Sequence, residues 1–330
     1  MTVLVTGGAG YIGSHTVRAL RGEGSDVVVL DSLEYGHREA VLDAPVEVGD
    51  IADADLVRRV VEQYHVDQVV HFAGYKAAGE SMRMPERYFD NNVARTARLL
   101  DALNQAGVKR FVFSSSAAVY GTPQNLPVDE DHATGPESPY GESKLMVEQM
   151  LRWFGNCHGL HSDALRYFNA AGASSDAVLG EDSHTPLNLV PVAMTAALGQ
   201  MPALPIYGTD YDTADGSCIR DYVHVEDLAD GHVRALRYLE DGGDTTIINL
   251  GTGVGSSVLE VVAATKRASG IDFPTRIDPR RPGDPTAVYA DNRRARALLG
   301  WEAKFGLDEI VNSAWGWHST HPHGFGSITA

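Results

Sequence analysis

Short hydrophobic segments alternate with amphipathic ones from the first residues of the chain. Apolar side chains, many of them β-branched, predominate in short segments at residues 3–5, 27–30, 46–48, 69–72 and 111–113, which are predicted strands. Helices are predicted where apolar positions recur every three to four residues, over 11–23, 53–64 and 88–106. Strands that are apolar along their whole length are buried on both faces, as in a parallel sheet covered by helices. The pattern predicts an α/β fold of the Rossmann type, with a doubly wound parallel sheet.

The second half of the chain is less regular. Residues 172–216 are rich in Gly, Pro, Asp and Ser, which is typical of loops in a small lobe. Ordered elements then resume at 219–225, followed by a strand at 246–250 and helices at 228–239, 257–268, 291–299 and 307–317. Ser257 and Glu260 have the spacing of a helix capping box. We expect a sheet domain over 1–171 and a smaller C-terminal lobe over 172–330, from which segments around 219–260 return to the sheet domain.

Composition narrows the class of protein. The 330 residues are 43% hydrophobic and carry a formal net charge of −17, which argues against a basic surface for nucleic acid. No apolar segment reaches the ~18 residues that a membrane span needs. The N-terminus has no basic, apolar leader, and the only cysteines are Cys157 and Cys218, far apart in the sequence. We expect a cytoplasmic protein that binds neither nucleic acid nor membrane.

A glycine-rich turn joins the first predicted strand to the first predicted helix. Gly7, Gly10 and Gly13 let the backbone approach a pyrophosphate, whose charge then faces the helix N-terminus. Asp31 ends the second predicted strand, where a carboxylate accepts hydrogen bonds from ribose hydroxyls and repels a 2′-phosphate. This combination predicts a dinucleotide site that prefers NAD to NADP.

Two other features suggest ligands more weakly. The glycine-rich residues 251–256 also lie between a strand and a helix, but no acidic residue follows at a second strand end, so a tight turn is expected. Histidines cluster near Cys157 and near the C-terminus without complete zinc spacing. We expect no metal.

Three residues suggest proton transfer. Tyr140 and Lys144 are four residues apart, which places them on one face of a predicted helix that follows Pro139. A tyrosine is a poor base near neutral pH unless a cation stabilises its phenolate, and we expect Lys144 to supply that cation. Ser116 follows the fifth predicted strand and can hydrogen-bond the same substrate hydroxyl. Such a trio suits removal of a proton from an alcohol while hydride leaves its carbon.

These motifs together resemble the UDP-galactose 4-epimerase (UDP-glucose 4-epimerase) family of the extended short-chain dehydrogenase/reductase superfamily. The resemblance rests on TGGAGYIGSH at 6–15, HFAGYKAAGES at 71–81, FSSSAAVYG at 113–121, SPYGESK at 138–144 and IRDYVHVEDLADGH at 219–232. It spans nearly the whole chain. It implies NAD as cofactor and a UDP-sugar as substrate.

The resemblance also implies roles for individual residues. Catalysis would fall to Tyr140, Lys144 and Ser116. NAD would contact the glycine turn (Gly7, Gly10, Tyr11, Ile12, Gly13), Asp31, Asp50, Ile51, Phe72, Ala73, Gly74, Lys76, Asn91, Phe168 and the pair Tyr140 and Lys144. The UDP-sugar would contact Ser116, Asn169, Asn188, Tyr207, Arg220, Arg281, Asp284 and Val288.

The implied reaction is 4-epimerisation of UDP-hexoses through a transient 4-keto sugar. A family position that is bulky in enzymes restricted to UDP-hexoses is Val288 here, so we expect N-acetylated UDP-sugars to be accepted too. The alternatives are a 4-epimerase of UDP-xylose or UDP-glucuronate, a dehydrogenase that releases NADH, and a non-catalytic NAD-binding module. A dehydratase is disfavoured because Ala117 and Ala118, rather than a carboxylate, follow Ser116.

The resemblance further implies a homodimer. Family members commonly pair two helices across the dimer interface, and here the helices that begin near Tyr88 and Tyr140 carry apolar faces. The apolar residues on those faces include Leu99, Leu103, Val147 and Leu151.

Overall fold

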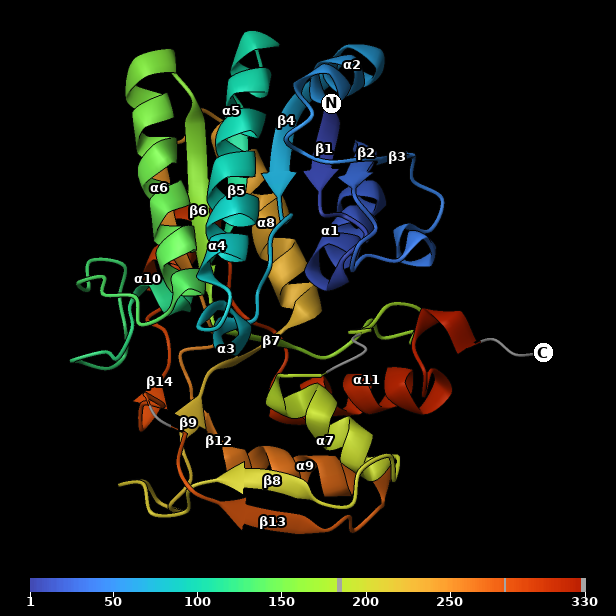
Figure 1. The fold of residues 1–330 in the computed structure, drawn as a ribbon, viewed down its shortest axis with the longest axis vertical. Helices are drawn as coiled ribbons and strands as arrows, with labels where there is room; N and C mark the ends of the chain where they lie inside the picture. The colour runs from blue at the N-terminus through green and yellow to red at the C-terminus, as the bar shows by residue number, and fades with distance from the viewer. Residues whose placement is uncertain (183–185, 282, 328–330) are drawn as a thin grey trace.

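The computed structural model describes residues 1–182, 186–281 and 283–327. Its centre is a seven-stranded parallel sheet with the strand order β11-β6-β5-β4-β1-β2-β3 (Figure 1). The strands are β1 (Thr2–Thr6), β2 (Asp26–Asp31), β3 (Val46–Val48), β4 (Val66–His71), β5 (Arg110–Ser116), β6 (His161–Tyr167) and β11 (Thr246–Leu250). This is the Rossmann strand order with β11 added beyond β6. The predicted fold class is confirmed.

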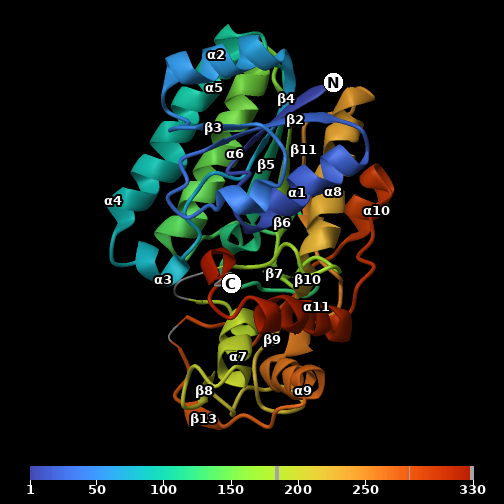
Figure 2. The same cartoon turned by 90° about the vertical axis from the view of Figure 1, so that its right-hand side faces the viewer.

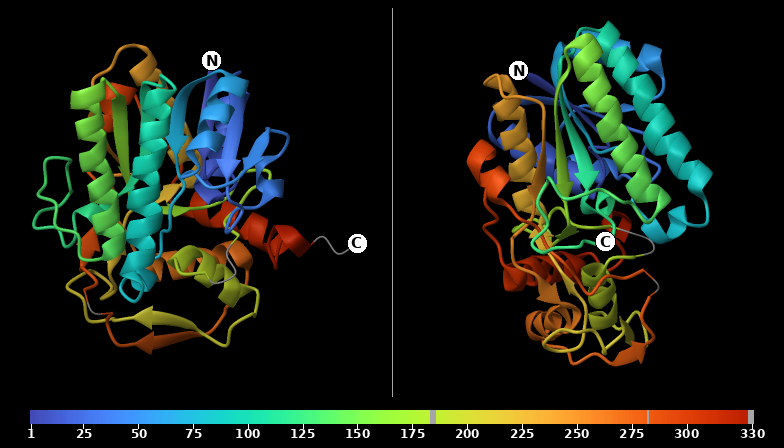
Figure 3. Two further views of the ribbon diagram at one scale, coloured as in Figure 1. Left: turned by 45° about the horizontal axis from the view of Figure 1, so that its top comes forward. Right: turned by 90° about the vertical axis from the view of Figure 1, so that its left-hand side faces the viewer.

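Helices cover both faces of this sheet (Figures 2 and 3). One face packs against α1 (Tyr11–Gly22), α8 (Val225–Glu240) and α10 (Arg293–Leu299). The other packs against α2 (Ala54–Tyr64), α5 (Arg95–Gln105) and α6 (Pro139–His158). The apolar residues of β1, β2, β4 and β5 are buried between the two layers, which explains the hydrophobic segments in the sequence, whereas those of the edge strand β3 are partly exposed.

A smaller lobe lies beyond the carboxyl ends of the strands, towards which the arrows of β1 and β4 point (Figure 1). Its helices are α7 (Leu189–Ala197), α9 (Val258–Ser269) and α11 (Leu307–Thr320), and β8 (Leu204–Tyr207) pairs with β13 (Thr275–Asp278). Ser257 and Glu260 form the predicted capping box at the start of α9. The division of function between a sheet domain and a substrate-binding lobe stays a prediction.

Short strands connect the lobe to the large sheet. One pair is β7 (Asn169–Ala171) with β10 (Tyr222–His224), and the other group is β9 (Ile219–Arg220), β12 (Ser256–Ser257) and β14 (Ala287–Val288). The ordered segment predicted over 219–225 therefore consists of two short strands, β9 and β10. It is broken at Asp221, whose buried carboxylate takes hydrogen bonds from the neighbouring loop.

Two further elements differ from the prediction. Strand β6 was not expected, because the polar residues Ser162, Asp163 and Arg166 interrupt its apolar pattern although all three are buried. The helix expected over 88–106 begins earlier, with α4 (Pro85–Tyr88), a π-helical turn (Phe89–Ala94) and then α5. Among the described residues, no helix is both long enough and apolar enough to cross a bilayer.

The remaining elements are short. The helix α3 (Ala78–Ser81) precedes α4, and 3₁₀ turns occur at Arg38–Val41, Ala117–Val119 and Phe325–Ser327. The first of these turns follows β2 and the second follows β5, so both lie at the carboxyl edge of the sheet.

Candidate active site

The glycine turn between β1 and α1 requires residues without a Cβ. Gly7 has φ +71°, and a Cβ there would lie 2.5 Å from the backbone nitrogen of Ala73. A Cβ on Gly13 would lie 2.3 Å from the carbonyl oxygen of Gly7. The turn therefore brings the start of α1 against the segment after β4, and it presents backbone N–H groups at a helix N-terminus, as an anionic pyrophosphate requires.

Asp31 lies at the carboxyl end of β2, beside this turn. Its Oδ2 accepts a hydrogen bond from the backbone N–H of Ala9 at 2.9 Å, and its Oδ1 accepts one from Leu33 at 2.9 Å. Burial raises the pKa of this carboxyl, while the two backbone hydrogen bonds act in the opposite direction. The glycine turn and Asp31 are thus held together by a direct hydrogen bond, which is the arrangement that the adenosine half of NAD needs.

The other predicted cofactor residues continue along the same edge of the sheet. Asp50 follows β3 and pairs with Arg95 of α5, and Ile51 is buried beside it. Phe72, Ala73 and Gly74 follow β4. A Cβ on Gly74 would lie 3.8 Å from Lys144 Nζ, so this segment leads from the glycine turn to the predicted catalytic lysine.

The predicted catalytic residues come from β5 and α6. Ser116 ends β5, and α6 starts with Ser138 as its cap and Pro139 in its first turn. The Lys144 ammonium donates a hydrogen bond to the Ser114 carbonyl at 2.8 Å and lies 5.9 Å from the centre of the Tyr140 ring. The structure therefore brings together the three residues that the sequence separates by up to 28 positions (144 − 116).

Electrostatics at Tyr140 differ from the expectation. Burial raises the pKa of Tyr140, while a hydrogen bond with Ser116 and the positive charge of Lys76 act to lower it. Burial lowers the pKa of Lys144 to about 8, against the effect of Glu148. The sequence predicts Lys144 as the cation that stabilises the phenolate, whereas in the structure the positive charge that lowers the pKa of Tyr140 is that of Lys76. Lys144 lies beside the ring, and its action on the phenolate stays a prediction.

The sequence missed residues that hold this group in place. The Ser81 hydroxyl accepts a hydrogen bond from the backbone N–H of Tyr140 at 3.2 Å. Asn92 donates to the Ser143 hydroxyl at 3.1 Å and accepts from the backbone of Tyr75 at 2.8 Å. Glu181 of the lobe accepts from Lys76 at 2.7 Å. Ser81 ends the motif HFAGYKAAGES, and Asn92 directly follows the predicted cofactor residue Asn91, whereas nothing in the sequence marks Glu181.

The lobe places the predicted sugar-nucleotide residues near the same edge. Arg220 forms an ion pair with Asp284, and the Arg281 guanidinium lies 3.9 Å from the centre of the Tyr207 ring. Val288 pairs with Arg220 in the register of β14 and β9. Guanidinium groups in this position suit a diphosphate, and an aromatic ring suits a base or a ribose.

The remaining predicted site residues lie on β7, before α7, near the 3₁₀ turn after β5 and in the π-helical turn. Asn169 starts β7, where its N–H donates to the Asp221 carbonyl at 2.9 Å, and Asn188 precedes α7 as its cap residue. Phe168 packs against the small cluster around Val119, and Asn91 lies in the π-helical turn.

The second glycine-rich segment has a structural role. Both carboxylate oxygens of Asp221 accept hydrogen bonds from this loop, including one from the Thr252 N–H at 3.0 Å. A Cβ on Gly251 would lie 2.6 Å from Asp221 Oδ2. The N–H groups that would meet a phosphate are therefore taken by a carboxylate of the same chain.

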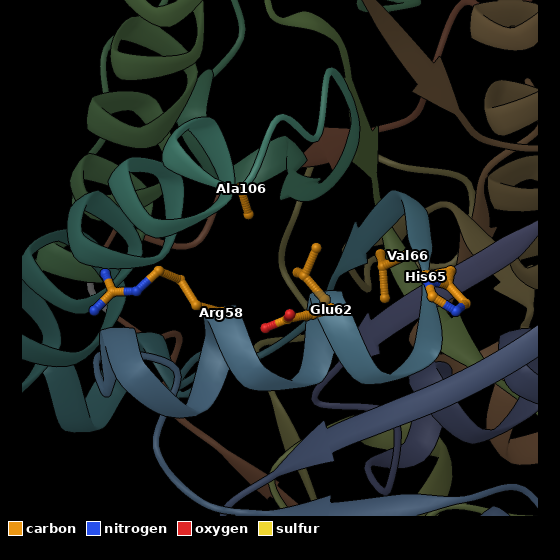
Figure 4. A pocket seen from close by; sticks show the side chains of 6 residues that line it. Arg58, Glu62, His65, Val66 and Ala106 are labelled. Carbon is orange, nitrogen blue, oxygen red and sulfur yellow. The ribbon is translucent and has the colours of Figure 1, made fainter.

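Other features do not contribute to the site. In the part of the chain that the structure describes, no group of three or more His, Cys, Asp or Glu side chains could hold a metal ion. A hollow lined by Arg58, Glu62, His65 and Ala106 lies at the C-terminal ends of α2 and α5 (Figure 4). These residues are at the opposite end of the sheet from Ser116, and none of them is a predicted site residue.

The whole chain is similar to known proteins. A family model described as "NAD dependent epimerase/dehydratase family" matches residues 3–251. The UDP-glucose 4-epimerase of Lacticaseibacillus casei is 47% identical over 99% of this chain and 99% of its own. The structure of UDP-glucose 4-epimerase from Bifidobacterium longum in complex with NAD⁺ and UDP has a TM-score of 0.91 at 42% identity, covering 98% of this chain and 100% of that one. The UDP-Glc/GlcNAc 4-epimerase from Campylobacter jejuni has a TM-score of 0.86 at 40% identity, covering 97% and 99%.

Proposed function

The chain belongs to the NAD dependent epimerase/dehydratase family, and from this membership we propose that it interconverts UDP-glucose and UDP-galactose through a transient 4-keto sugar. It is an isomerase of the UDP-glucose 4-epimerase type, and it binds NAD. The observation that carries the proposal is the meeting of the glycine turn with Ser116, Tyr140 and Lys144 at one edge of the sheet, in a chain that matches such enzymes end to end.

The chain's own residues handle the proton. Tyr140, as its phenolate, takes the proton of the sugar C4 hydroxyl, and Ser116 hydrogen-bonds the same oxygen. Lys144 and Lys76 stabilise the negative charge on the phenolate. Bound NAD accepts the C4 hydride and later returns it. The keto sugar turns about its bond to the diphosphate, so that hydride returns to the opposite face and Tyr140 gives the proton back.

The two arginines of the lobe would hold the diphosphate. Arg220 and Arg281 offer planar donors, and Asp284 can accept ribose hydroxyls. A firm grip on the nucleotide alone leaves the sugar free to present either face. Binding of the nucleotide by the lobe and proton transfer by the sheet domain would explain why the arginines lie in the lobe, whereas Tyr140 and Ser116 lie on the sheet domain.

The residues at the site fit a dehydratase or a non-catalytic NAD-binding module less well than an epimerase. A dehydratase needs a carboxylate beside the catalytic hydroxyl group, and Ala117 and Ala118 follow Ser116. A non-catalytic NAD-binding module has no need for the buried Tyr140 and Lys144. Incubation with UDP-galactose, UDP-xylose and UDP-glucuronate, each followed by chromatography and by absorbance of released NADH, separates the remaining candidates.

We further propose that the enzyme accepts UDP-GlcNAc and UDP-GalNAc. Val288 is a small side chain next to the proposed diphosphate ligand Arg220, and the related Campylobacter jejuni enzyme is named a UDP-Glc/GlcNAc 4-epimerase. The test compares Val288→Tyr with the control Val288→Ile. Tyrosine should abolish turnover of UDP-GlcNAc and leave that of UDP-glucose, whereas isoleucine should leave both. Equal loss of both activities in Val288→Tyr would contradict the proposal.

A homodimer is also proposed, but not through the apolar residues that the sequence suggested. Leu99, Leu103, Val147 and Leu151 are at most 2% exposed and belong to the core of a single chain. Trp153 on the outer face of α6 is 58% exposed and is a better candidate for a contact between copies. Sedimentation of the unaltered protein and of Trp153→Glu tests this proposal, since the variant should be a monomer.

A further inference from the structure

The face of α6 that carries the proposed catalytic residues continues for one more turn. Tyr140, Lys144 and Glu148 follow one another at a spacing of four, which places them in a row along the helix. All three are buried against β5 and β6. Glu148 therefore places a carboxylate in the buried row of Tyr140 and Lys144, although burial of a charge costs free energy.

Glu148 is fully engaged in hydrogen bonds. Its Oε1 accepts from the Ser115 hydroxyl at 2.6 Å and from Arg166 Nε at 2.9 Å, and its Oε2 accepts from Arg166 Nη2 at 2.6 Å. The side chains of Arg166 and Glu148 are only 3% and 4% exposed. Such a buried ion pair adds little net stability compared with apolar residues of the same volume. Stability alone therefore does not account for it.

The partners of Glu148 lead directly to the reacting groups. Ser115 lies between Ser114, whose carbonyl accepts from the Lys144 ammonium, and Ser116, whose hydroxyl interacts with Tyr140. A hydrogen bond from Ser115 to Glu148 fixes the end of β5 against α6. This contact sets the positions of both the carbonyl and the catalytic hydroxyl.

Glu148 also acts on the charge of Lys144. Among the described residues, the ionisable groups around Lys144 and Tyr140 are Glu148 on α6, His71 on β4, Lys76 on the loop after β4, Tyr88 on α4, and Arg166 and Tyr167 on β6. Burial lowers the pKa of His71 to about 3, so this imidazole is neutral. Glu148 is the acidic group that favours the charged form of Lys144.

We propose that Glu148 is a positioning residue for epimerisation, which keeps Lys144 cationic beside Tyr140 and fixes Ser116 through Ser115. The inference rests on the proposed function, since it assigns Glu148 a part in the same proton transfer. Glu148 touches neither the substrate nor the reacting oxygen. Its effect passes through Lys144 and the backbone of β5.

The test uses two substitutions that break the same ion pair with opposite electrostatic effects. Glu148→Gln removes the negative charge near Lys144, so the alkaline limb of the kcat–pH profile should move down by about one pH unit. Arg166→Met removes the positive charge and leaves Glu148, so the same limb should stay or move up. The double variant Glu148→Gln/Arg166→Met leaves no unpaired buried charge and should shift as Glu148→Gln does.

The readouts separate the possible failures. Turnover of UDP-glucose by the unaltered enzyme tests the proposed function before any variant is made. Bound NAD and the unfolding temperature check that each variant is folded, and the double variant takes the place of Glu148→Gln if that one does not fold. If the two single variants lose kcat without a shift, or shift in the same direction, Glu148 is only structural and the inference is overturned.

Discussion

Asp163 is a buried carboxyl whose effect on stability should depend strongly on pH. It lies in the middle of β6, between β5 and β11, and is 0% exposed. Within the described part of the chain, neither of its carboxyl oxygens has a hydrogen-bond partner. Burial raises the pKa of Asp163 to about 8.

The direction of the effect follows from proton binding. The unfolded chain loses this proton near pH ~4, whereas the folded protein keeps it until about pH 8. Between these values the unfolded state binds fewer protons, so the free energy of unfolding falls by about 1.4 kcal/mol per pH unit on account of this residue. From pH 5 to pH 8 the loss is about 4 kcal/mol.

Asp163→Val and Asp163→Asn both remove the titration. As pH rises from 5 to 8, the free energy of unfolding of each variant should increase relative to that of the unaltered protein by about 4 kcal/mol. This corresponds to a relative rise of about 8 °C in unfolding temperature, at ~2 °C per kcal/mol. The Asp163→Val variant should also be more stable than Asp163→Asn at every pH, since asparagine leaves a buried amide unpaired. Urea or thermal unfolding at pH 5, 6, 7 and 8 measures the difference. A difference that stays constant with pH would show that Asp163 is already ionised in the folded protein.

Two further predictions concern the ligands. Gly7→Ala should abolish bound NAD, because a φ of +71° costs an alanine ~1–2 kcal/mol and the added Cβ would meet Ala73. The control is Gly24→Ala, where φ is +84° but the space around the residue is open, so this variant should lose stability and keep NAD. Chromatography of the nucleotide released from each purified variant measures the bound NAD. Arg281→Met should raise KM for the UDP-sugar about tenfold to a hundredfold, the loss of ~1.5–3 kcal/mol for a charge-assisted hydrogen bond, with NAD content unchanged. An unchanged KM would remove Arg281 from the diphosphate site.

The sequence predicts the parts of the fold where one physical requirement dominates. Strands buried on both faces need continuous apolar segments, so β1, β2, β4 and β5 could be recognised. Strand β6 could not, because the charges of Asp163 and Arg166 hide its burial. Arg166 is neutralised by Glu148, which is 18 residues earlier in the chain and becomes its partner only through tertiary packing.

The same distinction applies to the site. The glycine turn, Asp31 and the Tyr140–Lys144 pair carry local signals, since each requires a fixed spacing within one turn or helix. The ion pair of Lys76 with Glu181 joins residues 105 positions apart, so only the folded chain reveals it. For this reason the sequence does not predict that Lys76 acts on the charge of Tyr140.

The central claim is that one bound NAD takes a hydride from C4 of the sugar and returns it to the same carbon. The direct measurement is turnover of UDP-glucose deuterated at C4 by the purified enzyme with no NAD added, with Tyr140→Phe as the inactive control. The account predicts UDP-galactose that keeps its deuterium at C4 and no net release of NADH. Deuterium lost to water, or transferred to a released NADH, would contradict it.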